Sequence, residues 1–507
     1  MKTEILKQKC SKDCINYVIL AVIIIIISLF KLGSSPIKND IPAIDSSVFQ
    51  IMGRGLLNNQ IIYKDLFDHK GPIVYIINAL AYIINPNVGL YIMETIILYI
   101  GLIFIYKNSR LFLNERLSMI TSLVYLIPVF SYLDSGNYTE EYALTFTNIA
   151  LYNILKIFKN NKYNKKSNWV IIGATFAVNL MIKPTYIAVW IAFGIVQLFC
   201  SIKEKKIKEL LKYILYMLGG ILIILIPIFL YLIINNDIKD FIDAYFLMNM
   251  KYSKTSMYEK ITTFIKLAKY YKCFIYIIGM LIGNLILIFG KNISKRIKSF
   301  VTIFNIMLLI LAAWAANLYQ HYLIQTAPGI ATCLIFLLYI IKNKIENKDK
   351  IQNIIKQLPI KFIYVCAIIV LLLLDISYNT VINFDYFKLK YNYNELKRNS
   401  ILEINNYMDE DDELFVLGND ESCYIILNKQ PKYKYFFQTP IFLYDKQILE
   451  DAVKYIYYAK PKVVFKSTTN NKMLFEKICK NADEILNNEY EEHDKGIFKY
   501  YVLKENK

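Results

Sequence analysis

Long apolar segments without a charge constrain this 507-residue chain more than any other feature. Residues 15–30 form a run of 16 residues without a charge, and residues 213–234 form one of 22. About 20 helical residues are needed to cross the hydrocarbon core of a bilayer. With 56% hydrophobic residues and a mean hydropathy of +0.35, a soluble chain could not bury this much apolar surface in one or two cores. The sequence therefore predicts a polytopic membrane protein.

Charge divides the chain into two parts. Residues 1–383 carry 40 basic and 20 acidic side chains, whereas residues 384–507 carry 19 and 21. A hydrophilic tail of 124 residues is long enough to fold by itself. We predict a transmembrane domain over 1–383 and a C-terminal domain over 384–507. The lysines cluster between apolar runs, where they anchor cytoplasmic loops, so the basic excess does not indicate nucleic-acid binding.

The positive-inside rule orients the chain. Placing the Lys/Arg-rich connections on the cytoplasmic side assigns that side to residues 1–14, 107–116, 159–168, 201–212, 291–298 and 342–361. This orientation requires about 11 transmembrane helices, near residues 15–32, 88–106, 117–133, 141–158, 169–182, 185–200, 213–235, 273–290, 300–318, 322–341 and 361–383. The 13 apolar residues of 72–84 reach only ~20 Å as a helix, short of the ~30 Å core. We expect them to form an interfacial or re-entrant helix.

This topology places the N-terminus in the cytoplasm and the C-terminal domain on the extracytoplasmic side of the membrane. The first outer loop spans residues 33–87. The tail has an α/β pattern, with strand-like segments at 414–418 and 463–465, a helical segment at 446–458 and a closing strand at 498–503. The predicted fold class is thus an all-α polytopic domain plus a small extracytoplasmic α/β domain.

Polar residues gather on the predicted outer face. They are Asp45, Asp65, Asp68 and His69 in the first loop, Glu140 and Glu141 at the start of a span, and His321. Ionisable groups beside or inside spans are costly unless paired or hydrated, which makes them candidates for function. Each could instead be a solvated loop residue. Asp45 could also cap the helix predicted over 46–57, and adjacent glutamates suit a helix N-terminus. One outer cavity could collect them all.

The order of these motifs resembles the GT-C superfamily of polytopic glycosyltransferases. Asp45 lies early in the first loop, a segment Tyr63-Lys64-Asp65 follows, and His69-Lys70-Gly71-Pro72 precedes the short apolar helix. The layout is similar to bacterial relatives of protein O-mannosyltransferases and lipid A aminoarabinose transferases, whose first loop carries an acidic motif and a Lys-Pro-Pro element. Glu140-Glu141, Lys183-Pro184 and His321-Tyr322 match the same pattern. The resemblance covers residues 1–345.

The resemblance implies an inverting sugar transfer from a polyprenyl-phosphate donor to a hydroxyl of a glycan, lipid or protein acceptor. It implies that Asp45 is the catalytic base and that Asp68, Glu140 and Glu141 bind the sugar or the acceptor. The implied donor-phosphate ligands are Arg54, His69, Lys70, Lys183, His321 and Tyr322. The only cofactor that the resemblance suggests is a divalent metal ion, with Asp45 as a possible ligand. The family's Asp-Glu motif is Asp45-Ser46 here, which leaves one carboxylate to act as a base.

Two other functions compete with this interpretation. A flippase or transporter of lipid-linked glycans would place polar residues at the bilayer midplane and show paired halves. A polymerase of lipid-linked glycans would share the outer site. A nucleotide-sugar enzyme is disfavoured because no predicted cytoplasmic segment carries a Gly-rich phosphate loop. We expect the tail to pack over the outer cavity and to help to select the acceptor.

Overall fold

The computed structural model describes residues 2–160, 165–314, 316–345, 384–439, 441–466, 472–496 and 498–505. The chain divides into two compact units. The membrane unit consists of Met1–Lys31, Met93–Ile228 and Thr255–Asn383, and the loop–tail unit of Leu32–Ile92, Phe229–Lys254 and Phe384–Lys507. The first loop, predicted to lie outside, and the C-terminal tail therefore belong to the same unit.

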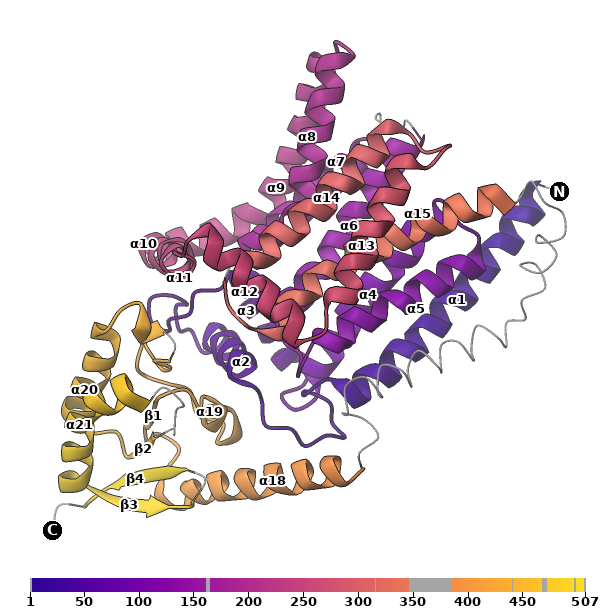
Figure 1. The fold of residues 1–507 in the computed structure, drawn as a ribbon. Coiled ribbons are helices and arrows are strands. Elements are labelled where there is room, and N and C mark those ends of the chain that lie inside the picture. Colours follow the sequence, from indigo (N-terminus) through magenta and orange to yellow (C-terminus); the bar gives the residue numbers. More distant parts are fainter. Residues whose placement is uncertain are drawn as a thin grey trace. The chain divides into compact units, whose positions relative to one another are not determined.

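The membrane unit is helical (Figure 1). Its helices and 3-10 turns are α1 (Lys2–Lys31), α4 (Gly89–Arg110), α5 (Glu115–Tyr132), α6 (Thr139–Asn160), α7 (Lys166–Leu180), η1 (Pro184–Tyr186), α8 (Ala188–Lys203), α9 (Ile207–Ile234), α12 (Met257–Tyr270), α13 (Phe274–Phe289), α14 (Lys295–Ala313), η3 (Gln320–Thr326) and α15 (Ala327–Ile345). The last turns of α9 and the first of α4 extend into the loop–tail unit. The predicted break at Lys183-Pro184 lies between α7 and α8.

Several of these helices are long and apolar enough to cross a membrane. Among the described residues they are Asp13–Lys31, Gly89–Arg110, Ile207–Ile234, Lys295–Ala313 and Gln320–Asn343, and α12 with α13, bent by 111°, would make a sixth span. The five single helices coincide with predicted spans, and so does α13, whereas α12 falls in the segment 236–272 that was predicted to lie outside the membrane. The other predicted spans fall on shorter or more polar helices, except 361–383, which lies outside the described residues.

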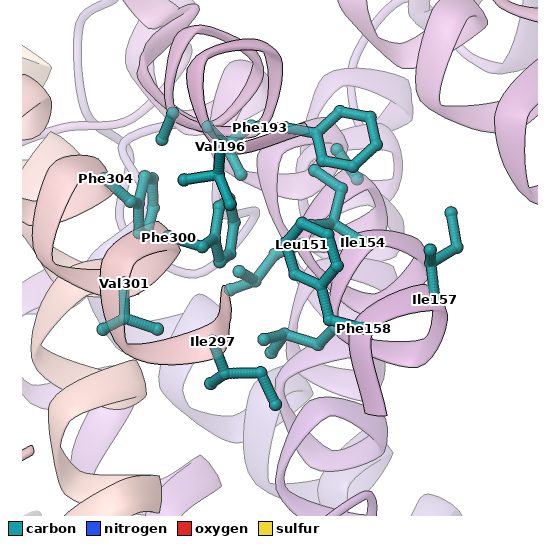
Figure 2. Packing of buried hydrophobic residues seen from close by; sticks show 14 of the residues in the cluster. Leu151, Ile154, Ile157, Phe158, Phe193, Val196, Ile297, Phe300, Val301 and Phe304 are labelled. Atoms are coloured by element: carbon teal, nitrogen blue, oxygen red, sulfur yellow. The ribbon is translucent and has the colours of Figure 1, made fainter. Parts of the chain in front are cut away.

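Aromatic packing and close backbone contact hold the membrane unit together. The rings of Phe158 on α6, Phe193 on α8 and Phe300 on α14 meet in one buried cluster, at centroid distances of 5.7 Å and 5.6 Å from Phe158 (Figure 2). α7 and α9 touch backbone to backbone, because a Cβ atom on Gly173 would lie 2.0 Å from the carbonyl oxygen of Met217. Only glycine permits this approach.

The loop–tail unit combines short helices with one sheet. Its elements are α2 (Ile44–Leu57), α3 (Pro72–Ile84), α10 (Ile238–Phe241), the π-helical turn η2 (Ile242–Met248), α11 (Asn249–Tyr252), α18 (Phe384–Leu402), η4 (Glu403–Tyr407), β1 (Leu414–Leu417), α19 (Ser422–Ile426), η5 (Ile441–Leu443), α20 (Gln447–Ala459), β2 (Val463–Lys466), α21 (Lys472–Glu489), β3 (Tyr490–Asp494) and β4 (Lys499–Leu503). The predicted helix over 72–84 is confirmed; no observation tests its position at the interface.

The sheet has the strand order β1-β2-β4-β3. β1 and β2 are parallel, and the other two pairs are antiparallel. Helices α20 and α21 pack against it through Leu449, Ile456 and Leu486, which contact Phe415 and Val464. The strands predicted at 414–418, 463–465 and 498–503 and the helix predicted at 446–458 are confirmed. The polar edge strand β3 and helices α18 and α21 were not predicted.

Inside the loop–tail unit, the tail packs directly on the first loop. Gln430 donates to the carbonyl oxygen of Ile51 at 3.0 Å, and Gln60 donates to that of Pro431 at 2.9 Å. The backbone N–H of Phe67 donates to the carbonyl oxygen of Lys434. These hydrogen bonds fix the segment between α19 and η5 along α2 and the loop that follows it.

Candidate functional site

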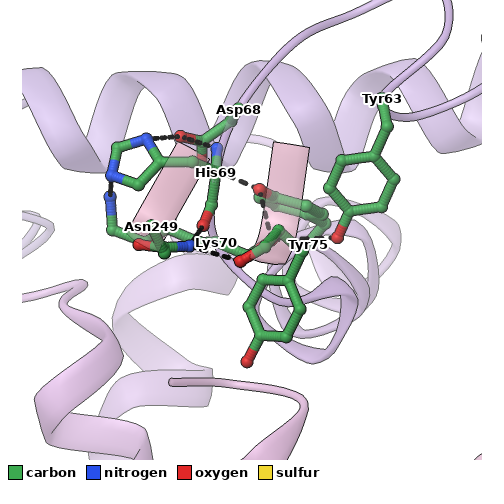
Figure 3. Close-up of polar contacts among 7 residues, drawn as sticks. Tyr63, Asp68, His69, Lys70, Tyr75 and Asn249 are labelled. Carbon is green, nitrogen blue, oxygen red and sulfur yellow. Dashed lines mark hydrogen bonds and ion pairs between the residues drawn. The ribbon is translucent and has the colours of Figure 1, made fainter. Parts of the chain in front are cut away.

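A cluster of polar side chains, four of them buried and two half-buried, lies where the first loop enters α3. We call it the loop cluster; its members are Tyr63, Asp68, His69, Lys70, Tyr75 and Asn249 (Figure 3). Asp68 and His69 are 1% and 7% exposed, and both tyrosines are fully buried. A cluster of charges and hydroxyls so far from solvent must satisfy its hydrogen bonds internally.

Asp68 is held from two sides. Its Oδ1 accepts from the backbone N–H of His69 at 2.7 Å and lies 3.3 Å from Nδ1 of the same residue. Its Oδ2 accepts from the hydroxyl of Tyr75 at 2.8 Å. Burial alone would raise the pKa of Asp68, but Lys70, His69 and Tyr75 outweigh it and hold the pKa well below its usual range. Asp68 is therefore a carboxylate at neutral pH.

His69 connects this carboxylate to Lys70. The Nζ atom of Lys70 lies 2.9 Å from Nε2 of His69, on the opposite side of the ring from Asp68. Burial and the charge of Lys70 lower the pKa of His69 below its ordinary value, although Asp68 and Asp45 oppose them. The imidazole is therefore uncharged at neutral pH.

The backbone around Lys70 is fixed as well. The hydroxyl of Tyr63 donates to the Lys70 carbonyl oxygen at 2.9 Å, and the Tyr75 hydroxyl lies 3.1 Å from the same oxygen. Asn249 on α11 donates to the carbonyl oxygen of His69 at 2.6 Å. Tyr63 has a φ of 70°, which is strained for a bulky side chain. Strain of this kind persists where the surrounding structure enforces it and occurs at functional sites.

Asp45 lies on the first turn of α2. The helix begins at Ile44 and its N-cap is Ala43, so the capping role considered for Asp45 is wrong. Asp45 is half-buried, and among the described residues it accepts no hydrogen bond and forms no ion pair. Its charge acts on His69 and on Glu421. A half-buried carboxylate without a partner, next to the loop cluster, is available to accept a proton.

The guanidinium of Arg54 is hydrogen-bonded to the C-terminal tail. It is 6% exposed and donates to Oδ1 of Asn428 at 3.2 Å and to the carbonyl oxygens of Tyr424 and Lys429 at 3.2 Å and 2.9 Å. Burial lowers the pKa of Arg54 to about 10, so the group stays charged at neutral pH. In this structure its guanidinium fastens α2 to α19, and a phosphate would have to displace these partners.

A second group of predicted residues lies in the membrane unit. Lys183 forms an ion pair with Oε1 of Glu140, whose Oε2 accepts from Thr139 at 2.8 Å. The Lys183 ammonium also lies 4.1 Å from the centre of the Tyr322 ring. His321 stacks on Tyr138 with 4.3 Å between ring centroids. We call Glu140, Lys183, His321 and Tyr322 the membrane-unit cluster.

Glu141 points to different partners. Its Oε2 accepts from the backbone N–H of Asn137 at 3.0 Å, and Glu94 of α4 accepts from the same N–H. Both glutamates are fully buried. Two carboxyl groups that share one donor in a buried place cannot both be ionised cheaply. Adjacent in sequence, Glu140 and Glu141 therefore have separate environments, one beside a lysine and one beside a second acid.

The structure divides the predicted site residues between the two units. Asp45, Arg54, Asp68, His69 and Lys70 lie in the loop–tail unit, and Glu140, Glu141, Lys183, His321 and Tyr322 in the membrane unit. Sequence reasoning missed Glu94, although it is an acid inside a predicted span. It also missed Tyr75 and Asn249, which no charge or motif marks. Glu421, buried without a partner for either carboxyl oxygen, lies in the tail segment that packs on α2.

The residues of these clusters do not form a metal site. Within the ranges that the structure describes, no three His, Cys, Asp or Glu side chains are arranged to hold a metal ion.

Comparison with solved structures defines the class of fold. ArnT from Cupriavidus metallidurans bound to undecaprenyl phosphate superposes with a TM-score of 0.60 at 12% identity, covering 97% of this chain and 98% of that chain. Its apo state gives a TM-score of 0.59 with the same identity and coverage. The archaeal oligosaccharyltransferase AglB from Archaeoglobus fulgidus, in complex with an inhibitory peptide and a dolichol-phosphate, gives 0.49 at 11% identity, covering 96% and 74%. The chain has the GT-C fold, and the predicted resemblance is confirmed at this level.

The family follows from the sequence itself. Residues 6–391 match the family model described as "Putative competence-induced protein Ccs4 N-terminal domain". The chain belongs to this family. A search of curated proteins found no match to the sequence.

Proposed function

We propose that this protein is a membrane glycosyltransferase that moves a sugar from a polyprenyl-phosphate donor to an acceptor hydroxyl at the outer face of a bacterial plasma membrane. The observation that carries the proposal is Asp45, a half-buried carboxylate without a partner among the described residues, on the first turn of α2. Its charge reaches His69, which holds Lys70. A base and a cation thus belong to the same loop of a GT-C fold.

The reaction needs these two groups in different roles. Asp45 takes the proton from the acceptor hydroxyl as its oxygen forms a bond to the anomeric carbon. The bond between that carbon and the phosphate oxygen breaks, and the polyprenyl phosphate leaves with the bonding electrons. Lys70 faces the charge that develops on the leaving phosphate, where a fixed cation lowers the barrier. The acceptor attacks opposite the phosphate, so the configuration inverts.

The membrane-unit cluster supplies a second candidate for donor binding. Lys183 and Tyr322 are in contact in this cluster, and Glu140 adds a carboxylate that can accept from sugar hydroxyls. In this structure Glu140 neutralises Lys183. We propose that a donor phosphate or an acceptor competes with this ion pair, so that the cluster binds substrate only when the pair opens.

The test uses cells that lack the gene. We expect their lipid extracts to accumulate a polyprenyl-phosphate-linked sugar, detected by mass spectrometry, and expect the wild-type gene to remove it. Asp45→Asn should fail to remove it although the protein reaches the membrane at normal levels. The matched control is Asp243→Asn, the same change at an exposed residue of the same unit.

Two outcomes would contradict the proposal. An unchanged lipid pool in the deletion strain would show that no such donor is consumed. Full complementation by Asp45→Asn would show that the reaction does not use this carboxylate, as expected for a flippase.

A further inference from the structure

Asp68 is too deeply buried to contact a sugar directly. It is 1% exposed, and both of its oxygens already accept hydrogen bonds, from the His69 backbone and from Tyr75. A carboxylate in this position acts on a substrate only through a neighbour. The neighbour that faces it is the ring of His69, with Nδ1 at 3.3 Å from Oδ1.

The hydrogen-bonding capacity of Lys70 fixes where the proton of His69 lies. A lysine ammonium group has three donors and no acceptor. Since its Nζ is 2.9 Å from Nε2 of His69, Nε2 must accept, and a neutral ring then carries its proton on Nδ1. Nδ1 lies 3.3 Å from Oδ1 of Asp68 without completing a hydrogen bond, so the carboxylate stabilises the proton there by its charge. A carboxylate commonly sets the tautomer of a histidine that binds a cation in this way.

We propose that Asp68 and His69 are positioning residues for Lys70: Asp68 holds the His69 ring as its Nδ1–H tautomer, and Nε2 of that ring anchors the Lys70 ammonium toward an anionic phosphate. The identity of the anion rests on the proposed function. The arrangement of the three side chains rests on the geometry alone.

A neutral ring between the two charges explains why Lys70 is not simply paired with Asp68. A direct ion pair would neutralise the ammonium, as Glu140 does for Lys183. Lys70 instead forms no ion pair with any described residue, and its other contact is the Phe49 ring at 5.9 Å. The ring of His69 holds the ammonium in place and leaves its charge available to a ligand.

The arrangement works only while His69 is neutral. Protonation would turn Nε2 into a donor and place two positive charges side by side, so the contact with Lys70 would break. The groups that face His69 are Asp68 and Lys70 from its own loop, Asp45 from α2 and the Tyr252 ring of α11, 5.5 Å away. Because burial and Lys70 lower the pKa of His69, this loss is expected only below its ordinary value of 6.5.

The first test reads the tautomer directly. The chain contains 3 histidines, so the full-length protein labelled with ¹⁵N-histidine in lipid nanodiscs gives three imidazoles, and His69→Gln assigns the one of interest. We expect the Nδ1–H form at pH 7.5, and we expect Lys70→Met to convert it to a mixture with Nε2–H. A charged ring or an Nε2–H ring in the wild type would overturn the proposal.

The second test separates positioning from folding. His69→Gln keeps an acceptor oxygen near the position of Nε2, so we expect it to retain more transfer than His69→Leu, which should lose about 100-fold in kcat. His69→Gln should also lose the acidic fall of the pH profile. Equal rates for the two variants would contradict the proposal. If the wild type shows no transfer at all, the proposed function fails, and the tautomer experiment still decides the positioning of Lys70.

Discussion

The two clusters hold a lysine in different ways. Lys183 in the membrane-unit cluster is paired with Glu140, a fully buried acid, so its charge is compensated before any ligand arrives. Lys70 in the loop cluster contacts a neutral ring, and the acid Asp68 lies on the other side of that ring. A lysine beside a carboxylate thus gives a neutral pair, whereas a lysine beside an uncharged imidazole remains an available cation.

This difference indicates a structural role for Lys183 and an electrostatic role toward a ligand for Lys70. A buried ion pair stabilises a structure against the loss of one partner, because the remaining charge would be left without compensation. An ammonium held by an uncharged acceptor contributes little to folding and keeps its electrostatic effect for a ligand. We therefore expect substitutions of Lys183 to change stability first and substitutions of Lys70 to change the rate first.

The largest effect is expected for Lys183→Met. It leaves Glu140 buried without a cation, which should cost about 3–5 kcal/mol of unfolding free energy and lower the unfolding temperature of the purified protein. Adding Glu140→Gln removes the stranded charge and should recover most of the loss. The control is Lys269→Met, on the exposed side of α12. If the double variant were no more stable than Lys183→Met, the ion pair would not be the reason.

Lys70→Met should lower the turnover rate and leave the stability almost unchanged. Removing one fixed donor from a developing anion costs about 100–1000-fold in turnover, and we expect an unfolding temperature close to that of the wild type. Lys64→Met, the same change at an exposed residue of the same loop, should be almost silent. A variant Lys70→Met with normal turnover would remove the contrast between the two lysines.

Much of the fold follows from local sequence patterns. The apolar run 72–84 predicts α3 to the residue, and alternating or continuous apolar runs in the tail predict β1, β2 and β4. Strand β3 escapes prediction because Glu491 and Glu492 give it the polarity of a loop, and only pairing with β4 makes it a strand. The π-helical turn at 242–248 has no distinguishing composition.

The site was predictable where charge marks it. Asp68, His69 and Lys70 stand together in sequence, and Glu140 and His321 stand out because a charge near the membrane is costly. Lys183 is indicated by the family resemblance alone. What each of them contacts was not predictable, since the partners come from distant segments: Tyr75 for Asp68, Asn249 for the His69 carbonyl, and the tail for Arg54. The spacing of residues along the chain does not indicate contacts between such distant segments.

Arg54 sharpens the comparison because it was the third cation expected to bind the phosphate. Its contacts with Asn428, Tyr424 and Lys429 predict a structural effect instead. Arg54→Lys loses the fork of donors and leaves buried carbonyl groups unsatisfied, which should cost about 2–3 kcal/mol. Faster hydrogen–deuterium exchange at residues 424–430 would indicate this loss of stability. Arg398→Lys, which loses one hydrogen bond to the carbonyl oxygen of Asp40, should increase the exchange of residues 424–430 less than Arg54→Lys does.

Asp237 extends the comparison to a buried acid that forms no ion pair with a described residue. It is fully buried, and neither carboxyl oxygen has a hydrogen-bond partner in the described structure. Burial raises the pKa of Asp237 to about 7, with Asp240 adding to the shift and Lys434 opposing it. The folded protein thus keeps a proton that the unfolded chain, with a value of 3.8, has already released.

The stability of the wild-type protein therefore depends on pH. Between the unfolded and the folded pKa the native state binds more protons, so stability falls as pH rises through this window and is constant above it. Asp237→Asn removes the dependence, so at pH 8 it should be more stable than the wild type, with no difference below pH 4. The measurement is the unfolding temperature at both ends of that range. Asp243→Asn, at an exposed position of the same segment, should show no gain, and an equal gain there would mean that net charge rather than the burial of Asp237 sets the stability.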